Sequence, residues 1–211
     1  MPIKELSIPL RKLHALSAVL IVAFLSLHIA NHLAGLAGVA THIAFMEAAR
    51  PIYRLPAVEV ALISAFALQL ASGLALAVRG WKRRQGLVAW LQAGSGIYLA
   101  FFIVVHVGSV LFGRGALDLN TNFYFAAAGL HVAPFRLFFA PYYFLGVVAL
   151  FTHLACAAYW HTQGRSRIAR ILMLAIPCVI GVGVSLLILL SLAGALYPVD
   201  IPARYKATYA L

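Results

Sequence analysis

The sequence predicts an all-α membrane protein, a bundle of five transmembrane helices with its N-terminus in the cytoplasm. Of its 211 residues, 64% are hydrophobic and only 10% are charged. The mean hydropathy of +0.98 is far above that of soluble globular domains. Apolar runs of about 20 residues, long enough to cross the bilayer as helices, occur five times. We place the spans at residues 14–37, 57–79, 88–112, 141–162 and 170–196.

Helices are the favoured way to cross the membrane, because backbone groups in lipid must form their hydrogen bonds internally. Segments of about ten residues with alternating polarity would indicate the strands of a membrane barrel, and the sequence has none. It also has no internal repeat, low-complexity tract or soluble domain. We therefore assign residues 1–211 to a single integral membrane domain.

The formal net charge of +11 indicates the topology of the chain, not a nucleic-acid partner. Cytoplasmic loops of membrane proteins carry an excess of Lys and Arg. Ten basic residues fall on the side of the N-terminus and six on the other, so we expect a cytoplasmic N-terminus in a bacterial-type inner membrane. The ten are Lys4, Arg11, Lys12, Arg79, Lys82, Arg83, Arg84, Arg165, Arg167 and Arg170; the six are Arg50, Arg54, Arg114, Arg136, Arg204 and Lys206.

Two connections between the spans have patterns of their own. Residues 41–50 show a helical apolar period, which predicts an amphipathic helix on the outer surface that ends at Pro51. Residues 113–140 are rich in aromatic side chains. We expect that segment to fold onto the bundle or the bilayer interface, either as an aromatic belt or as a lid over a site.

Four histidines lie within the predicted hydrocarbon region. An ionisable side chain there indicates a functional site, because leaving it unpaired costs roughly 2 to 3 kcal/mol or more. The other four histidines are interpreted as interface residues. The first group is His28, His32, His106 and His153; the interface group is His14, His42, His131 and His161.

His28 and His106 are expected at the same depth on two helices that run in the same direction. Each follows a residue at the cytoplasmic interface, Lys12 or Trp90, by sixteen positions, which is about 24 Å along a helix. Two neutral imidazoles at one depth suit the axial positions of a b-type haem iron within an apolar bundle. A hydrogen-bonded histidine pair or a polar seam is the alternative that the spacing leaves open.

Gln69 and His153 form a second level pair, closer to the cytoplasm, on two spans that run inward. Glutamine is a poor iron ligand because its amide has no basic lone pair, so this pair predicts half of a second haem site. His32 lies one turn after His28 on the same face, where it could contact a haem edge or donate to a quinone. As a metal pair, His28 and His32 lack an acidic or thiol partner at matching depth.

The histidine pattern resembles the diheme cytochrome b membrane anchor of succinate dehydrogenase and fumarate reductase, in its single-subunit, five-helix form. The resemblance covers about residues 15–165 and rests on short motifs in matching order. The motifs are Phe24-Leu-x-x-His28 with Asn31, Ala57-Val-Glu59 with Gly73, Leu91-Gln92 and Ser95-Gly96 before His106-Val, and Tyr143-Phe-Leu-Gly146 before Phe151-Thr-His153.

The resemblance implies that His28 and His106 are the axial ligands of one haem b iron. It implies His153 as the fourth-helix ligand of a second haem, but Gln69 stands at the second-helix ligand position and Ala93 replaces a basic residue of the family. It further implies a quinone site, and iron–sulfur and flavoprotein subunits docked on the cytoplasmic face. The expected function is an electron-transfer subunit between such a partner and membrane quinone, without a complete catalytic cycle of its own.

Two other functions are consistent with the sequence. One is a haem-free membrane anchor that keeps the fold without cofactors, which the glutamine substitution favours for at least one site. The other is a transport protein or membrane enzyme with a His-ligated non-haem metal, which would bind metal without the absorption of haem.

Overall fold

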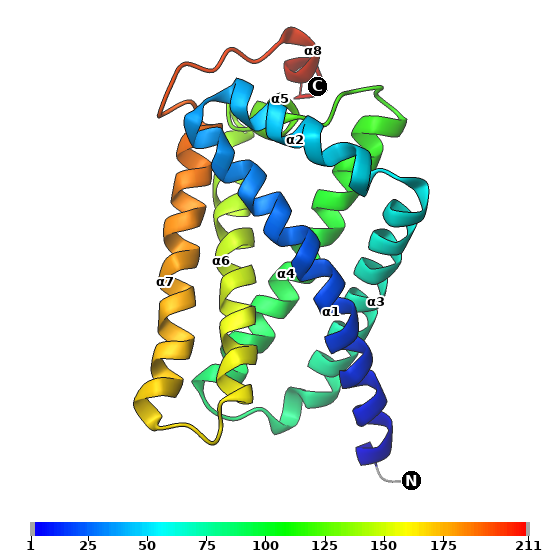
Figure 1. The fold of residues 1–211 in the computed structure, drawn as a ribbon, viewed down its shortest axis with the longest axis vertical. Helices are drawn as coiled ribbons and strands as arrows, with labels where there is room; N and C mark the ends of the chain where they lie inside the picture. The colour runs from blue at the N-terminus through cyan, green and yellow to red at the C-terminus, as the bar shows by residue number, and fades with distance from the viewer. Residues whose placement is uncertain (1–2, 210–211) are drawn as a thin grey trace.

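The structure, a computed structural model, describes residues 3–209, and within this range the chain forms only helices, turns and loops. Five helices are long and apolar enough to cross a membrane, which confirms the predicted all-helical membrane fold (Figure 1). They are α1 (Ile3–Ala34), α3 (Pro56–Gly80), α4 (Leu87–Gly115), α6 (Arg136–His161) and α7 (Arg167–Leu192). The shorter elements are α2 (Val39–Tyr53), α5 (Phe123–Ala128), α8 (Ala203–Lys206), η1 (Gly35–Ala37), η2 (Trp81–Arg83) and η3 (Ala207–Tyr209).

All five spans begin before the residues that the sequence predicts, and the first and the fourth differ most. The apolar span of the first helix starts at Leu10, four residues before the predicted start at residue 14. The fourth starts at Arg136 and continues through Pro141, which is the first residue of the predicted span. A proline in the second turn of a membrane helix removes one backbone hydrogen bond without ending the helix.

Local sequence signals set the ends of several helices. Gly38, with φ of 112°, separates η1 from α2, in a conformation that favours glycine. Pro56 occupies the first turn of α3, where its missing N–H costs nothing. The Ser166 and Asn122 side chains accept hydrogen bonds from backbone N–H groups at the starts of α7 and α5, as N-cap residues do.

The long helices form two packed groups. Helix α1 packs against α3, and α6 packs between α4 and α7, while α3 and α4 join the groups along one side. Within the described chain, the backbone of α1 has no close contact with that of α4 or α6. Helix α1 therefore lies apart from the α4–α6 pair, with space for side chains or a ligand between them.

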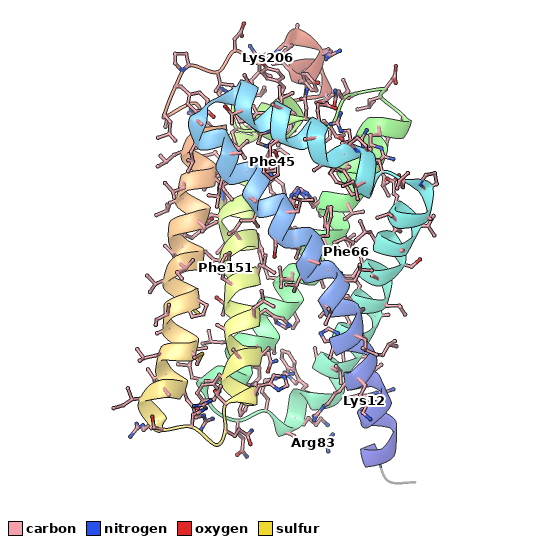
Figure 2. The ribbon with its side chains drawn as sticks, in the orientation of Figure 1. Lys12, Phe45, Phe66, Arg83, Phe151 and Lys206 are labelled. Carbon is pink, nitrogen blue, oxygen red and sulfur yellow. The ribbon has the colours of Figure 1, made fainter. Side chains whose placement is uncertain are left out.

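The two ends of the bundle differ in structure. One, which we call the basic end, carries η2 and the loop before α7, and Figure 2 shows Lys12 and Arg83 there. The other, the capped end, is covered by α2, α5 and the segment with α8 and Lys206 (Figure 1). A cluster of buried residues lies under this cap. It consists of Leu119, Phe123, Ala127, Ala128, Ile188, Leu192, Ile201 and Tyr205.

The aromatic segment at residues 113–140 folds onto the capped end of the bundle. Phe123 is fully buried at the start of α5, and Tyr205 from the last helix donates a hydrogen bond to the carbonyl of Asn120 over 3.0 Å. The predicted amphipathic helix is α2, which crosses the same end (Figure 1). It does not end at Pro51, as the sequence predicts, but continues through that residue to Tyr53. Three segments distant in sequence thus close one end of the bundle.

Candidate cofactor-binding cavity

A cavity of about 1710 Å³ runs between α1, α3, α4 and α6. It exceeds the ~300–1,000 Å³ of most small-molecule sites. Its walls are mainly apolar, but histidines of both halves of the bundle line it. The cavity extends from Arg11 and Arg84 at the basic end to Arg54 and Arg114 near the capped end.

His28 of α1 and His106 of α4 face each other across this cavity, and we call them the capped-end pair. Their ring centres are 5.9 Å apart, with 74° between the ring planes. Each ring stacks on the phenylalanine one turn earlier in its own helix: Phe24 lies 5.7 Å from His28 at 19°, and Phe102 lies 5.1 Å from His106 at 13°. Aromatic packing thus fixes the planes of both imidazoles.

His32 lies beside the capped-end pair, and its ring centre is 4.8 Å from that of His28. On its other side is His42 of α2, at 5.3 Å. The sequence predicts an interface position for His42, but only 3% of this residue is exposed, and it contacts the Asn31 amide over 3.3 Å. Burial, and secondly the nearby His28, lower the pKa of His42 to about 4.

A second pair of imidazoles lies nearer the basic end. His14 of α1 and His153 of α6 have ring centres 6.4 Å apart and ring planes at 74°; we call them the basic-end pair. The sequence predicts His14 at the membrane edge and Gln69 level with His153. In the structure Gln69 contacts His14 instead, with its Nε2 3.0 Å from the Nε2 of that histidine.

Hydrogen bonds define the tautomers of the basic-end pair. The Ser72 hydroxyl donates to the Leu68 carbonyl, so it accepts from Nδ1 of His14 over 2.9 Å. Nδ1 of His153 donates to the Gln92 carbonyl over 3.1 Å. Both rings therefore carry the proton on Nδ1 and a lone pair on Nε2, the form in which histidine binds a metal.

Two Ser-Gly pairs support the basic-end histidines from neighbouring helices. Ser72 and Gly73 of α3 contact His14, while Ser95 and Gly96 of α4 contact His153, with Ser95 Oγ 3.2 Å from its Nδ1. A Cβ atom on Gly73 would lie 3.1 Å from Cε1 of His14, and one on Gly96 would lie 3.0 Å from Cε1 of His153. Glycine thus allows each ring to lie directly against the adjacent helix.

Charged groups line the cavity at both ends. Near the capped end, Arg114 donates to Glu59 over 2.5 Å and Arg54 donates to Thr121 over 3.0 Å. At the basic end, Arg84 stacks over the rings of Trp81 and Trp90. The further arginines of this end that line the cavity are Arg11, Arg79 and Arg83.

The arrangement suits an iron that brings its own equatorial ligands. Among the described residues no cluster of three or more His, Cys, Asp or Glu can hold a metal, so each pair offers two imidazoles and no further ligand. Imidazoles on opposite sides of one iron have ring centres about 6 Å apart, since each metal–nitrogen bond is about 2 Å and each ring centre lies about 1 Å further. Both pairs match this distance, and the apolar cavity suits a porphyrin.

Sequence reasoning missed His14, although one signal was present. His14 precedes His28 by fourteen residues, which is about 40° short of four full helical turns, so both face the same side of α1. The predicted start of the span at residue 14 placed this histidine at the interface. Of the other two interface histidines, His131 contacts the Leu192 carbonyl over 2.9 Å. His161 ends α6 and lines the cavity.

Comparison of the chain with protein-family models, with curated proteins and with solved structures finds no match in any of the three.

Proposed function

We propose that this protein is a haem b-containing membrane anchor that passes electrons between a succinate dehydrogenase or fumarate reductase-like partner and membrane quinone. The observation that carries the proposal is the capped-end pair, His28 and His106, with ring centres 5.9 Å apart across an apolar cavity. A haem b held there by His28 and His106 would supply one-electron transfer. The family resemblance of the sequence supports the same function.

The residues of the chain have distinct roles in this proposal. His28 and His106 bind the iron, and the stacked rings of Phe24 and Phe102 hold the two imidazoles in place. The apolar walls would keep water away from the cofactor, and the two neutral imidazoles would hold its iron. His32 lies one turn beyond His28, where its ring can contact the haem edge or donate to a quinone oxygen.

The arginines near each end of the cavity complement the negative charges of a bound haem. Arg54 and Arg114 lie near the capped end, where Glu59 balances one of the two charges. Carboxylate groups of the cofactor form strong hydrogen bonds with guanidinium groups. The charges of the chain and of the cofactor are therefore compatible in sign.

The orientation and the partners follow from the same proposal. The basic end, with Lys12 and Arg83 (Figure 2), faces the cytoplasm of a bacterial-type cell, as the excess of Lys and Arg near it favours. An iron–sulfur subunit with a flavoprotein docks there, against the basic turn that contains Trp81 and Arg84. Quinone binds near the capped end, close to His32 and the aromatic segment.

The test is a reduced-minus-oxidised spectrum and a pyridine haemochrome assay of the purified protein. We expect a sharp α-band of haem b and loss of one and the same component in His28→Ala and in His106→Ala. His131→Ala is the matched control, because His131 lies in the loop after α5 and binds the Leu192 carbonyl. A capped-end signal that survives in either ligand variant would exclude the assignment.

Metal analysis of the same sample separates the alternatives. A folded, monodisperse protein without haem or metal would favour the haem-free anchor. A stoichiometric metal without a Soret band would favour the His-ligated metal protein. Either result would contradict the proposal.

A further inference from the structure

We propose that His14 and His153 bind a second haem, so that α1 supplies one axial ligand to each of two haem sites in the same cavity. This inference rests on the proposed function, because it extends the same cofactor chemistry to the basic end. It differs from what the family resemblance implies, since that resemblance places the second ligand on α3, where Gln69 stands.

The first support is the distance between the two rings. At 6.4 Å between centres, the basic-end pair is close to the ~6 Å expected for two imidazoles on opposite sides of one iron. It is also close to the 5.9 Å of the capped-end pair. The rings are not hydrogen-bonded to each other, because the polar contacts of each go to other residues.

The second support is the orientation of the lone pairs. Nδ1 of His14 is bound to Ser72 and Nδ1 of His153 is bound to the Gln92 carbonyl, which leaves Nε2 of each ring as the ligand atom. Metal-binding histidines usually donate their other ring N–H in this way, which fixes the ring and raises its basicity.

Gln69 is the competitor for this site. Its amide donates to Nε2 of His14, and its carbonyl oxygen accepts from Ser17 over 2.5 Å. An iron at His14 therefore requires the Gln69 amide to turn away, which a side chain with three rotatable bonds can do. The remaining contact with Ser17 can hold Gln69 beside the cofactor.

The third support is the charge at this end of the cavity. Arg11, Arg79, Arg83 and Arg84 all line it. Arg84 is held in place by Trp81 and Trp90 and by a hydrogen bond of 3.1 Å to the Ala77 carbonyl. These guanidinium groups suit the carboxylates of a second haem.

The two sites are also far enough apart to hold one haem each. The spacing of His14 and His28 separates them by about 21 Å along α1.

The experiment counts haem per chain in matched variants of the whole protein. We expect two haems per chain in the wild type, and one in His14→Gln, His153→Ala and His28→Ala. His14→Gln keeps a polar side chain at the same position, so a folded protein is expected. His131→Ala serves again as the control with two haems.

A fourth variant separates iron ligation from a structural role. His14→Met should keep two haems but raise the midpoint potential of one component, because Met–His ligation raises haem potentials. Equal potentials in His14→Met and in the wild type would contradict ligation by His14.

The outcomes distinguish this inference from the proposed function. One haem per chain in the wild type, lost in His28→Ala and unchanged in His14→Gln, would overturn the second site and leave the first intact. Two haems in His14→Gln would exclude His14 as a ligand. A protein without haem would overturn both proposals.

Discussion

The two histidine pairs of the cavity are similar in distance but are held by different forces. The capped-end rings stack on phenylalanines of their own helices. The basic-end rings are hydrogen-bonded and lie against Ser-Gly pairs of neighbouring helices. The same ring separation is therefore reached by aromatic packing at one end and by polar contacts at the other.

The difference predicts how each pair responds to mutation. A ring held by packing is displaced by a change in side-chain volume, because protein interiors are close-packed. A ring held by hydrogen bonds is affected when one polar partner is removed, because a buried donor is then left unsatisfied. Volume changes should therefore act on the capped-end pair, and deletions of a hydroxyl should act on the basic-end pair.

The largest effect is expected from Gly146→Ala in α6. A Cβ atom at Gly146 would lie only 2.4 Å from Cε2 of Phe102, the ring that stacks on His106. We expect Phe102 to move, a loss of stability of about 1–3 kcal/mol and a broadened capped-end haem signal. Thermal unfolding in detergent and the α-band measure these effects.

The matched control is Gly94→Ala in α4. No atom lies within 4 Å of a Cβ at Gly94, so the substitution should leave both stability and spectrum close to those of the wild type. If Gly146→Ala were as neutral as Gly94→Ala, the aromatic packing of Phe102 would not determine the position of His106.

The parts of this fold that the sequence predicted are those that depend on helix periodicity alone. The five spans and the shared face of His28 and His32 follow from composition and from 3.6 residues per turn. The amphipathic helix α2 follows from its apolar period. Each of these is a local property of one segment.

Contacts between helices could not be predicted in the same way. The residue that faces His153 depends on which helix packs near it. The prediction that Gln69 faces His153 used only the equal depth of the two residues in the membrane. In the structure, α1 begins at Ile3 and so carries His14 to that level. The burial of His42 depends on the cap formed by α2 and α5, which no single segment specifies.

A smaller effect is expected from Ser72→Ala at the basic end. The substitution leaves Nδ1 of His14 without its acceptor, which should cost about 1 kcal/mol of stability. The ring also becomes a less basic ligand, so the midpoint potential of the basic-end haem should rise while that of the capped-end haem stays constant. A redox titration that resolves two components measures this.

The control for Ser72→Ala is Ser26→Ala. Ser26 is exposed and donates to the Val22 carbonyl of its own helix, so its loss should change neither potential. Equal shifts of both components in Ser72→Ala would indicate a general change of the bundle and not a local effect on His14.

The smallest expected effect is a loss of folding stability in acid, caused by protonation of His42 at the capped end. The pKa of His42 is about 4, below its usual value of 6.5, so the unfolded chain binds this proton more tightly than the folded one. Stability is therefore lost as the pH falls from about 6.5 to about 4 and is unaffected by this group at higher pH. Asn31, His32 and Phe123 contact His42, and the His28 imidazole is near enough to lower its pKa.

His42→Gln should remove this part of the acid sensitivity. It loses the ring contact with Phe123, so a lower unfolding temperature at neutral pH is expected, with a smaller decrease between pH 7 and pH 4.5. In the wild type, we expect the capped-end haem to be released before the basic-end haem as the pH falls. If His42→Gln loses this order of release, the buried imidazole of α2 determines the acid stability of the capped end. Identical pH profiles of the two proteins would show that His42 is protonated without cost, contrary to its burial under the cap.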